Sequence, residues 1–195
     1  EGARLAIVDR SPIVREIALS RQIVLSSEIL DWARNPDNPE LARLALDEME
    51  SFRPNFADQS YFIALLGPGR YYHNNAKNEF AGRQYRYTLS PAKPQDRWFY
   101  DIVRQQRDIH INVNPDFNLG VTKLWIDVLL RDGDRILGVA GTGLDLTPLL
   151  QAVLEQTRPG MASLFVDHDG AIQAHRDQRL IDFASISKSA TEHKT

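Results

Sequence analysis

Apolar residues recur at helical spacing near the start of the chain. Ser11 is suited to cap a helix and Pro12 to take its first position, and an apolar stripe continues toward Arg34. The stripe contains Ile13, Ile17, Leu19, Ile23, Val24, Ile29 and Leu30. We therefore predict a single helix over residues 11–34.

A second helix is predicted directly after the sequence NPDNP. Asn38 can cap this helix, Pro39 can take its first position, and Pro54 ends it. Over residues 39–52 the apolar positions again repeat at helical spacing, and they are Leu41, Leu44, Ala45, Leu46 and Met49.

After Asp58 the hydrophobic pattern becomes that of short strands. SYFIALLGPGRYY is typical of two strands joined by a Gly-Pro-Gly turn, and IHINVN alternates in the manner of a strand. The alternation in QYRYTLS places Tyr85 and Tyr87 on one face, with Arg86 and Thr88 on the other. Between these strands, RWFYDIVRQQ is predicted to form a short helix.

The strongest local signal is a hairpin, because VTKLWIDVLL and RILGVAG flank the turn sequence RDGD. One face of its first strand carries Leu124, Ile126, Val128 and Leu130, and the other carries Lys123, Trp125 and Asp127. A helix from Thr147 to Gln156 and a further hairpin in MASLFVDHDGAIQAH follow. The pattern predicts an α+β fold with an antiparallel sheet, then a partial second sheet unit.

The sequence GVAGTG invites comparison with a dinucleotide-binding loop. Gly138, Gly141 and Gly143 follow the spacing GxxGxG rather than GxGxxG, and the strand before them belongs to a tight hairpin. A nucleotide-dependent enzyme therefore stays an alternative that requires a parallel sheet. The simpler interpretation is that these small residues let another segment approach the strand closely.

Composition narrows the function classes. With a net charge of −3 and a pI near 6.0, the chain lacks the excess of positive charge that is typical of nucleic-acid-binding proteins. No apolar stretch approaches the ~20 residues that span a bilayer, and the absence of cysteine excludes disulfides and thiolate metal sites. The chain opens on Glu1-Gly2 and stops in a polar sequence, so we expect a fragment of a longer protein whose membrane segments flank it.

Catalytic chemistry has little support in the sequence. His168 and His175, with Asp167 and Asp169, are candidates for holding a metal, but a solvated hairpin turn is the simpler interpretation. No serine lies in a GxSxG context. We therefore predict no enzyme activity, no catalytic residue, no metal and no cofactor.

The sequences DRWFYDI, INVN, KLWIDVLLRDGDRILGVAGTGLDL and LFVDHDGAIQAH together resemble the double-Cache family. These are extracytoplasmic sensor domains of transmembrane histidine kinases, chemoreceptors and diguanylate cyclases. The resemblance covers roughly residues 61–182. It implies an N-terminal helix over 1–35, a membrane-distal Cache domain over 36–146, a linker helix over 147–158, and the start of a truncated membrane-proximal Cache domain over 159–195.

The resemblance also implies a ligand site in the distal domain. The best-known amino-acid-binding form has an Arg two residues before a Trp, a Tyr-x-Asp on the next strand, and a later Asp. The corresponding positions of this chain hold Asp96, Trp98, Asn112, Asn114 and Gly143. Only Trp98 matches, so a standard α-amino acid is not expected unless Arg97 or Arg86 binds the ligand carboxylate.

We expect a polar site at these positions and their neighbours. The candidate ligand-binding residues are Arg86, Tyr87, Asp96, Trp98, Asn112, Asn114, Trp125 and Asp127, with Tyr85 as a further aromatic. Two carboxylates near aromatic faces favour a cationic or hydroxyl-rich ligand. Ordinary structural roles stay open: core packing for Trp98 and Trp125, a helix N-cap for Asp96, and a turn for Asn114. Tyr71 and Tyr72 are interpreted as strand surface.

The expected function is therefore that of a small-molecule sensor, the periplasmic part of an inner-membrane receptor, without catalysis. Ligand binding would bias one of two arrangements of the N-terminal helix, and the broad apolar stripe of that helix favours a parallel homodimer. The alternative from another class is a structural or protein-interaction module of the same fold whose site holds no ligand.

Overall fold

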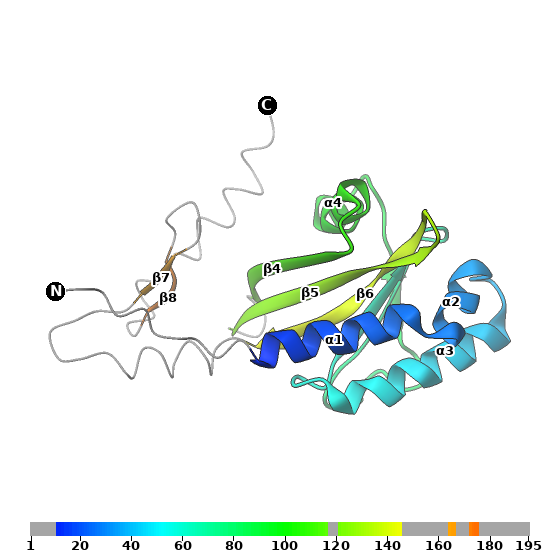
Figure 1. The fold of residues 1–195 in the computed structure, drawn as a ribbon, viewed down its shortest axis with the longest axis horizontal. Coiled ribbons are helices and arrows are strands. Elements are labelled where there is room, and N and C mark those ends of the chain that lie inside the picture. The colour runs from blue at the N-terminus through cyan, green and yellow to red at the C-terminus, as the bar shows by residue number, and fades with distance from the viewer. Residues whose placement is uncertain (1–10, 117–120, 146–163, 167–171, 176–195) are drawn as a thin grey trace, which may run out of the picture. The chain divides into compact units, whose positions relative to one another are not determined.

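The computed structural model describes residues 11–116, 121–145, 164–166 and 172–175. Contacts divide the chain into two units, one formed by 1–111 with 125–144 and the other by 112–124 with 145–195. The first unit carries the helices and most of a six-stranded sheet (Figure 1). The domain boundaries implied by the Cache resemblance stay predictions.

The N-terminal region forms two helices, so the single helix predicted over residues 11–34 is wrong. Helix α1 (Ser11–Leu25) ends at Ser26, whose φ of −65° and ψ of 132° are extended, and α2 (Ser27–Arg34) follows. The hydroxyls of Ser26 and Ser27 both donate to the Glu28 carboxylate, at 3.0 and 2.9 Å. Serine side chains that bond locally favour such a break over a continuous helix.

Helix α3 (Pro39–Phe52) has the predicted bounds and cap. The Asn38 side chain accepts hydrogen bonds from the backbone N–H groups of Glu40 and Leu41, at 3.0 and 3.2 Å. Pro39 takes the first position, where its missing N–H costs nothing. A 3₁₀ turn, η1 (Arg53–Asn55), follows the helix.

A carboxylate near the end of α3 ties this helix to the sheet. Glu50 accepts hydrogen bonds from the Tyr61 hydroxyl at 2.7 Å and from the Asn74 amide at 2.6 Å. Arg53 donates to the other carboxylate oxygen of Glu50 at 2.7 Å. The network joins one helix to two strands through charge-assisted hydrogen bonds.

The six strands form one antiparallel sheet in the order β3-β2-β1-β6-β5-β4. Their bounds are β1 (Tyr61–Leu65), β2 (Arg70–Asn74), β3 (Tyr85–Thr88), β4 (Ile109–Asp116), β5 (Val121–Asp132) and β6 (Arg135–Asp145). Strands β5 and β6 meet at the predicted turn, where Gly133 has a φ of +59°. The α+β class and the antiparallel sheet are confirmed.

The antiparallel arrangement excludes the nucleotide-binding interpretation of GVAGTG. Strand β6 pairs antiparallel with β1, and Gly141 stands opposite Phe62 in the ladder. A Cβ added at Gly141 would lie 1.8 Å from the Ile126 carbonyl oxygen, and one at Gly138 would lie 2.2 Å from the Ala64 carbonyl oxygen. The glycines thus allow close approach by neighbouring strands, as the simpler interpretation predicted.

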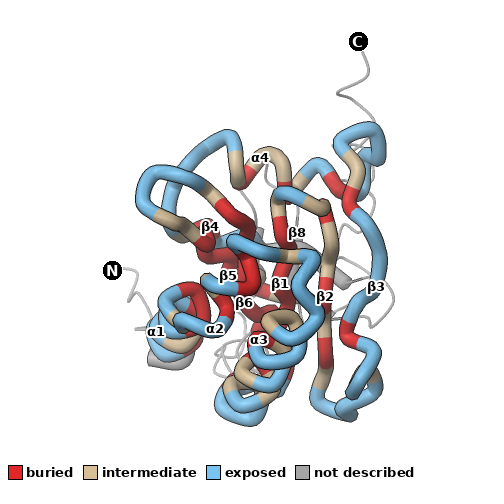
Figure 2. Tube along the Cα trace, turned by 90° about the vertical axis from the view of Figure 1, so that its right-hand side faces the viewer, coloured by how far each residue is buried: buried red, intermediate tan, exposed pale blue. Residues whose placement is uncertain are grey.

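Helices cover both faces of the sheet (Figures 1 and 2). Helices α1–α3 cover one face, where the Trp32 ring packs edge-on against Tyr72 with centroids 4.9 Å apart. The short helix α4 (Arg97–Gln105), which follows the 3₁₀ turn η2 (Pro94–Asp96), covers the other. We call this second surface the α4 face.

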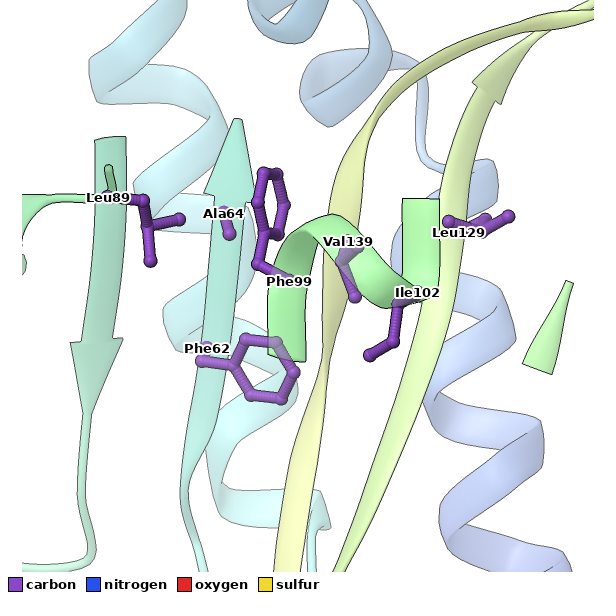
Figure 3. Close-up of a cluster of buried hydrophobic side chains, with 7 residues drawn as sticks. All are labelled: Phe62, Ala64, Leu89, Phe99, Ile102, Leu129 and Val139. Atoms are coloured by element: carbon purple, nitrogen blue, oxygen red, sulfur yellow. The ribbon is translucent and has the colours of Figure 1, made fainter. Parts of the chain in front are cut away.

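The core of the α4 face is a compact apolar layer. Phe99 and Ile102 of α4 face the central strands β1, β6 and β5 (Figure 3). The buried side chains of this layer are Phe62, Ala64, Leu89, Phe99, Ile102, Leu129 and Val139. The layer fixes α4, and hence the residues at its start, over the middle of the sheet.

A β-bulge overturns one prediction for the edge strand β3. Tyr71 pairs with Tyr87, but the next residue, Tyr72, pairs with Tyr85, so Arg86 is the extra residue. Tyr87 stacks on Tyr71, and Tyr85 packs edge-on against Tyr72. Because Tyr71 and Tyr72 point to opposite faces, Tyr85 and Tyr87 do so too, instead of sharing one face.

The second unit contains the predicted later hairpin. Strands β7 (Leu164–Val166) and β8 (Ile172–His175) pair antiparallel, with Leu164 opposite His175. The predicted helix from Thr147 to Gln156 lies outside the described residues, as do His168 and its neighbouring acids. Within the described residues, no helix is long and apolar enough to cross a membrane.

Candidate ligand-binding site

Five aromatic side chains meet on the α4 face, and we call them the aromatic cluster: Phe62, Tyr71, Tyr87, Trp98 and Trp125. The Phe62 ring lies 5.8 Å from Trp98 and 6.3 Å from Trp125, both in edge-to-face geometry. Tyr71 stacks on Phe62 at 5.9 Å and on Tyr87 at 5.0 Å. Such contacts each add to the stability of the cluster beyond the area that they bury.

The cluster is only partly shielded from solvent. Trp98, Trp125 and Tyr71 are half-buried, and 38% of Tyr87 is exposed, whereas Phe62 beneath them is buried. Aromatic rings that remain accessible above a buried layer are typical of ligand-binding surfaces.

Backbone geometry explains how Trp125 reaches its place. A Cβ added at Gly143 would lie 2.9, 3.0 and 3.2 Å from three carbons of the Trp125 indole. The indole therefore rests on β6 at a position where any larger side chain would displace it. The sequence resemblance predicts that Gly143 corresponds to the late Asp of the amino-acid-binding Cache form, and in the structure the Trp125 ring occupies the space beside Gly143.

Asp96 is buried at the start of α4, with 1% of its surface exposed. Its Oδ2 atom accepts a hydrogen bond from the Ser90 backbone N–H at 2.8 Å. Its Oδ1 atom is also buried and has no hydrogen-bond partner among the described residues. Asp96 stands at the N-cap position of α4, as the structural alternative predicted, but its side chain makes no capping hydrogen bond to the helix.

Asp127 is a second buried carboxylate on the same face. Asp127 lies two residues from both Trp125 and Leu129 on β5, so it points to the same side of the strand, and these two neighbours pack on the α4 face. Only 3% of the surface of Asp127 is exposed. Sequence reasoning placed Trp125 and Asp127 on one side of this strand, and the packing agrees.

Each of the two stacked tyrosines is subject to the charge of one carboxylate. Burial raises the pKa of the Tyr71 phenol well above its ordinary value, and the Tyr87 phenol and the Asp127 charge raise it further. Burial also raises the pKa of Tyr87, with a further contribution from the Asp96 charge. Both phenols therefore stay protonated and neutral.

The two candidate arginines do not join the aromatic cluster. The Arg86 guanidinium lies over the Phe80 ring, 3.7 Å from its centroid, and Arg97 is exposed. Asn112 and Asn114 belong to the second unit, where Asn112 is exposed and the Asn114 side chain lies outside the described part of the chain. No arginine therefore stands in the described cluster to bind a carboxylate group.

Sequence reasoning missed two members of the cluster. Tyr71 was interpreted as strand surface, and Phe62 lies in a strand that is apolar on both faces. Pairing of β1 between β2 and β6 brings both rings to the α4 face.

In the described residues, no three His, Cys, Asp or Glu side chains are grouped to hold a metal ion.

The fold is that of bacterial ligand-binding sensor domains. No protein-family model matches the chain. The ligand-binding domain of the Pseudomonas aeruginosa amino acid chemoreceptor PctC, solved with GABA, aligns with a TM-score of 0.58 at 22% identity, over 88% of this chain and 69% of that one. The corresponding domain of the Pseudomonas fluorescens chemoreceptor CtaA, solved with L-serine, aligns with a TM-score of 0.55 at 16% identity, over 89% and 68%.

A histidine kinase shares this fold. The sensor domain of the V. cholerae kinase DctB aligns with a TM-score of 0.61 at 11% identity, over 88% of this chain and 62% of that one. The TM-scores establish a common fold, whereas the sequence identities are too low to transfer a ligand or an output. Both must be argued from the residues of this chain.

Proposed function

We propose that this chain is the extracytoplasmic small-molecule-sensing domain of a transmembrane receptor, namely a histidine kinase, a diguanylate cyclase or a chemoreceptor. The fold shared with chemoreceptor and kinase sensor domains supports the coarse role. A double-Cache identity and a periplasmic location belong to the same proposal. The domain itself performs no chemistry, and its output lies in other parts of the receptor.

The observation that carries the proposal is the aromatic cluster with its two buried carboxylates. Half-buried tryptophans offer apolar and cation-binding faces, and Asp96 and Asp127 add negative charge beside them. A polar ligand that carries a positive charge or several hydroxyl groups suits this combination. The missing arginine makes a ligand recognised mainly by its carboxylate a poor fit.

Signal relay would use the N-terminal helix. Glu16, Ser20, Ile23 and Val24 of α1 are buried, whereas Val14 and Leu25 are 60% and 75% exposed. We propose that the exposed side of α1 meets the same helix of a second copy in a parallel homodimer. A ligand then shifts the arrangement of the helices only by its differential affinity for the two states. Sedimentation that finds only monomer at high concentration counts against the dimer.

A ligand panel with a matched pair of variants tests the sensing role. Melting temperature is measured with amines, sugars and carboxylates, and affinity for the best compound by calorimetry. Tyr87 and Tyr85 are both exposed residues of β3 on opposite faces of the sheet. We expect Tyr87→Ala to weaken binding by roughly 3- to 30-fold, the loss of one aromatic contact to a cation, and Tyr85→Ala to leave it unchanged.

Two results would contradict the sensing role. If no compound raises the melting temperature, the alternative of a ligand-free structural or interaction module of the same fold is favoured. If Tyr85→Ala and Tyr87→Ala weaken binding equally, the ligand does not lie on the α4 face. Stabilisation by carboxylates alone would refute the preference for a cationic or hydroxyl-rich ligand.

A further inference from the structure

Only one of the two Asp96 carboxylate oxygens has a hydrogen-bond partner among the described residues, although the side chain is almost completely buried. Its one hydrogen bond, from the Ser90 N–H at 2.8 Å, uses Oδ2, and the buried Oδ1 atom has no partner among the described residues. In the same part of the chain, no Lys, Arg or His side chain forms an ion pair with it. Buried carboxylates are costly unless they are paired with a cation and fully hydrogen-bonded.

Asp96 is held in place by structure on both sides. It ends the 3₁₀ turn η2, directly before α4, and Phe99 and Ile102 anchor that helix in the apolar layer. The bond from Ser90 fixes the carboxylate from the preceding loop. The unpartnered oxygen is therefore a preorganised acceptor, which lowers the cost of binding a donor there.

The acceptor adjoins the aromatic cluster. Trp98 lies two residues beyond Asp96 and contacts both Phe62 and Tyr71. The Asp96 charge also raises the pKa of Tyr87 and of Tyr100, after the larger effect of burial, as expected for a carboxylate close to both phenols. A molecule that lies against these rings reaches the buried Oδ1 atom only when the atoms that cover it move aside.

We propose that Asp96 Oδ1 accepts a hydrogen bond from a protonated amine of the ligand, so that the site selects ammonium groups with an N–H over quaternary ammonium groups. The inference rests on the sensing role proposed above and names its substrate class. The aromatic rings attract either kind of cation. Only an N–H donor also satisfies the buried oxygen, because a quaternary nitrogen has no hydrogen to donate.

A methylation series separates hydrogen bonding from ligand size. Ethanolamine, N-methylethanolamine, N,N-dimethylethanolamine and choline grow by one methyl group at each step, but the protonated forms of the first three keep an N–H and choline has none. Calorimetry on the 195-residue chain measures the affinity for each. We expect similar affinities for the first three compounds and a drop of roughly 10- to 100-fold at choline, the value of one charge-assisted hydrogen bond.

Two variants assign the drop to Asp96. Asp96→Asn keeps an acceptor for the Ser90 N–H but removes the charge, and we expect it to weaken binding of the first three amines toward that of choline. Asp101→Asn is the matched control, because Asp101 lies on α4, the helix that follows Asp96, and pairs with Arg104 at the surface. It should bind the series as the unmodified chain does, and circular dichroism verifies that both variants fold.

Each other outcome overturns the proposal. Choline binding as tightly as dimethylethanolamine refutes the N–H requirement, and a gradual decline across the series indicates size selection instead. A step at choline that persists in Asp96→Asn places the acceptor elsewhere. If no amine binds but a sugar or a carboxylate stabilises the chain, the amine proposal fails and the sensing role stands. If no compound of any class binds, both fail.

Discussion

Substituting Ala for Gly141 tests whether close strand approach builds the α4 face. The added Cβ would lie 1.8 Å from the Ile126 carbonyl oxygen and 2.9 Å from its carbon, whereas ordinary contacts begin at 3.4 Å. Both atoms belong to the backbone of β5, so no side-chain rotation relieves the overlap. Strands β5 and β6 must separate locally.

The expected cost follows from that separation. A shift of more than an ångström lengthens the adjacent ladder hydrogen bonds beyond useful range, and two lost bonds cost about 2 kcal/mol. Overpacking strain adds about 1–3 kcal/mol. We expect Gly141→Ala to lower the free energy of unfolding by about 3–5 kcal/mol, which corresponds to a fall in melting temperature of roughly 6–20 °C.

Gly143→Ala provides the matched comparison on the same strand. The overlapping atoms there belong to the Trp125 side chain, at 2.9 to 3.2 Å, and a half-buried indole is able to move. We expect a stability loss of only about 1 kcal/mol, together with a shift in tryptophan emission and weaker ligand binding. Gly143→Ala should therefore change the α4 face while the fold is kept.

Urea unfolding followed by circular dichroism, with fluorescence as a second probe, measures both variants. The expected order is unmodified chain, then Gly143→Ala, then Gly141→Ala, from most to least stable. If Gly141→Ala is as stable as the unmodified chain, the two strands do not approach as described. If Gly143→Ala leaves tryptophan emission unchanged, Trp125 does not rest on β6.

Substitutions at three further positions test other parts of the structure. Phe99→Ala removes a fully buried ring from the apolar layer and should cost about 3–5 kcal/mol in urea unfolding; a cost below about 1 kcal/mol would contradict its place there. Asn38→Ala removes the side chain that caps α3 and should lower the free energy of unfolding by about 1 kcal/mol, whereas Asn38→Asp should keep most of the stability. Equal stability of the two variants would show that the cap does not stabilise the protein. Burial alone would raise the pKa of Glu50, but its hydrogen bonds outweigh that effect and lower it below the ordinary 4.5. The stability that Glu50 contributes is therefore complete above pH 4.5 and is lost as the pH falls through the depressed value, so Glu50→Gln should unfold with a weaker acid dependence, and an unchanged pH profile would refute this.

Much of the order of elements follows from local sequence. The cap at Asn38, the helix over Arg97–Gln105 and the β5–β6 hairpin are confirmed, because capping, periodicity and turn chemistry act within a few residues. Glycine spacing and the adjacent hairpin argued against a nucleotide loop in GVAGTG, and the antiparallel pairing of β6 with β1 then excluded it. The placement of Trp125 and Asp127 on one face follows from strand alternation in the same way.

The candidate site was less accessible to sequence reasoning. Trp98, Tyr87, Asp96, Trp125 and Asp127 were named in advance, and they gather on the α4 face. Phe62 was not named, because a strand buried on both faces does not tell which of its rings will meet a ligand, and Tyr71 was interpreted as strand surface. Arg86 was named, yet the bulge in β3 turns it toward Phe80.

The sequence by itself determined the helices, the strands, their turns and the residue types available on each strand face. Only the tertiary structure decided that Tyr85 and Tyr87 point to opposite faces, and that the buried Asp96 keeps one oxygen without a partner among the described residues. The physical reason is the range of the forces. Periodicity and capping depend on neighbouring residues, whereas register, burial and hydrogen-bond satisfaction depend on segments that meet only after the chain has folded.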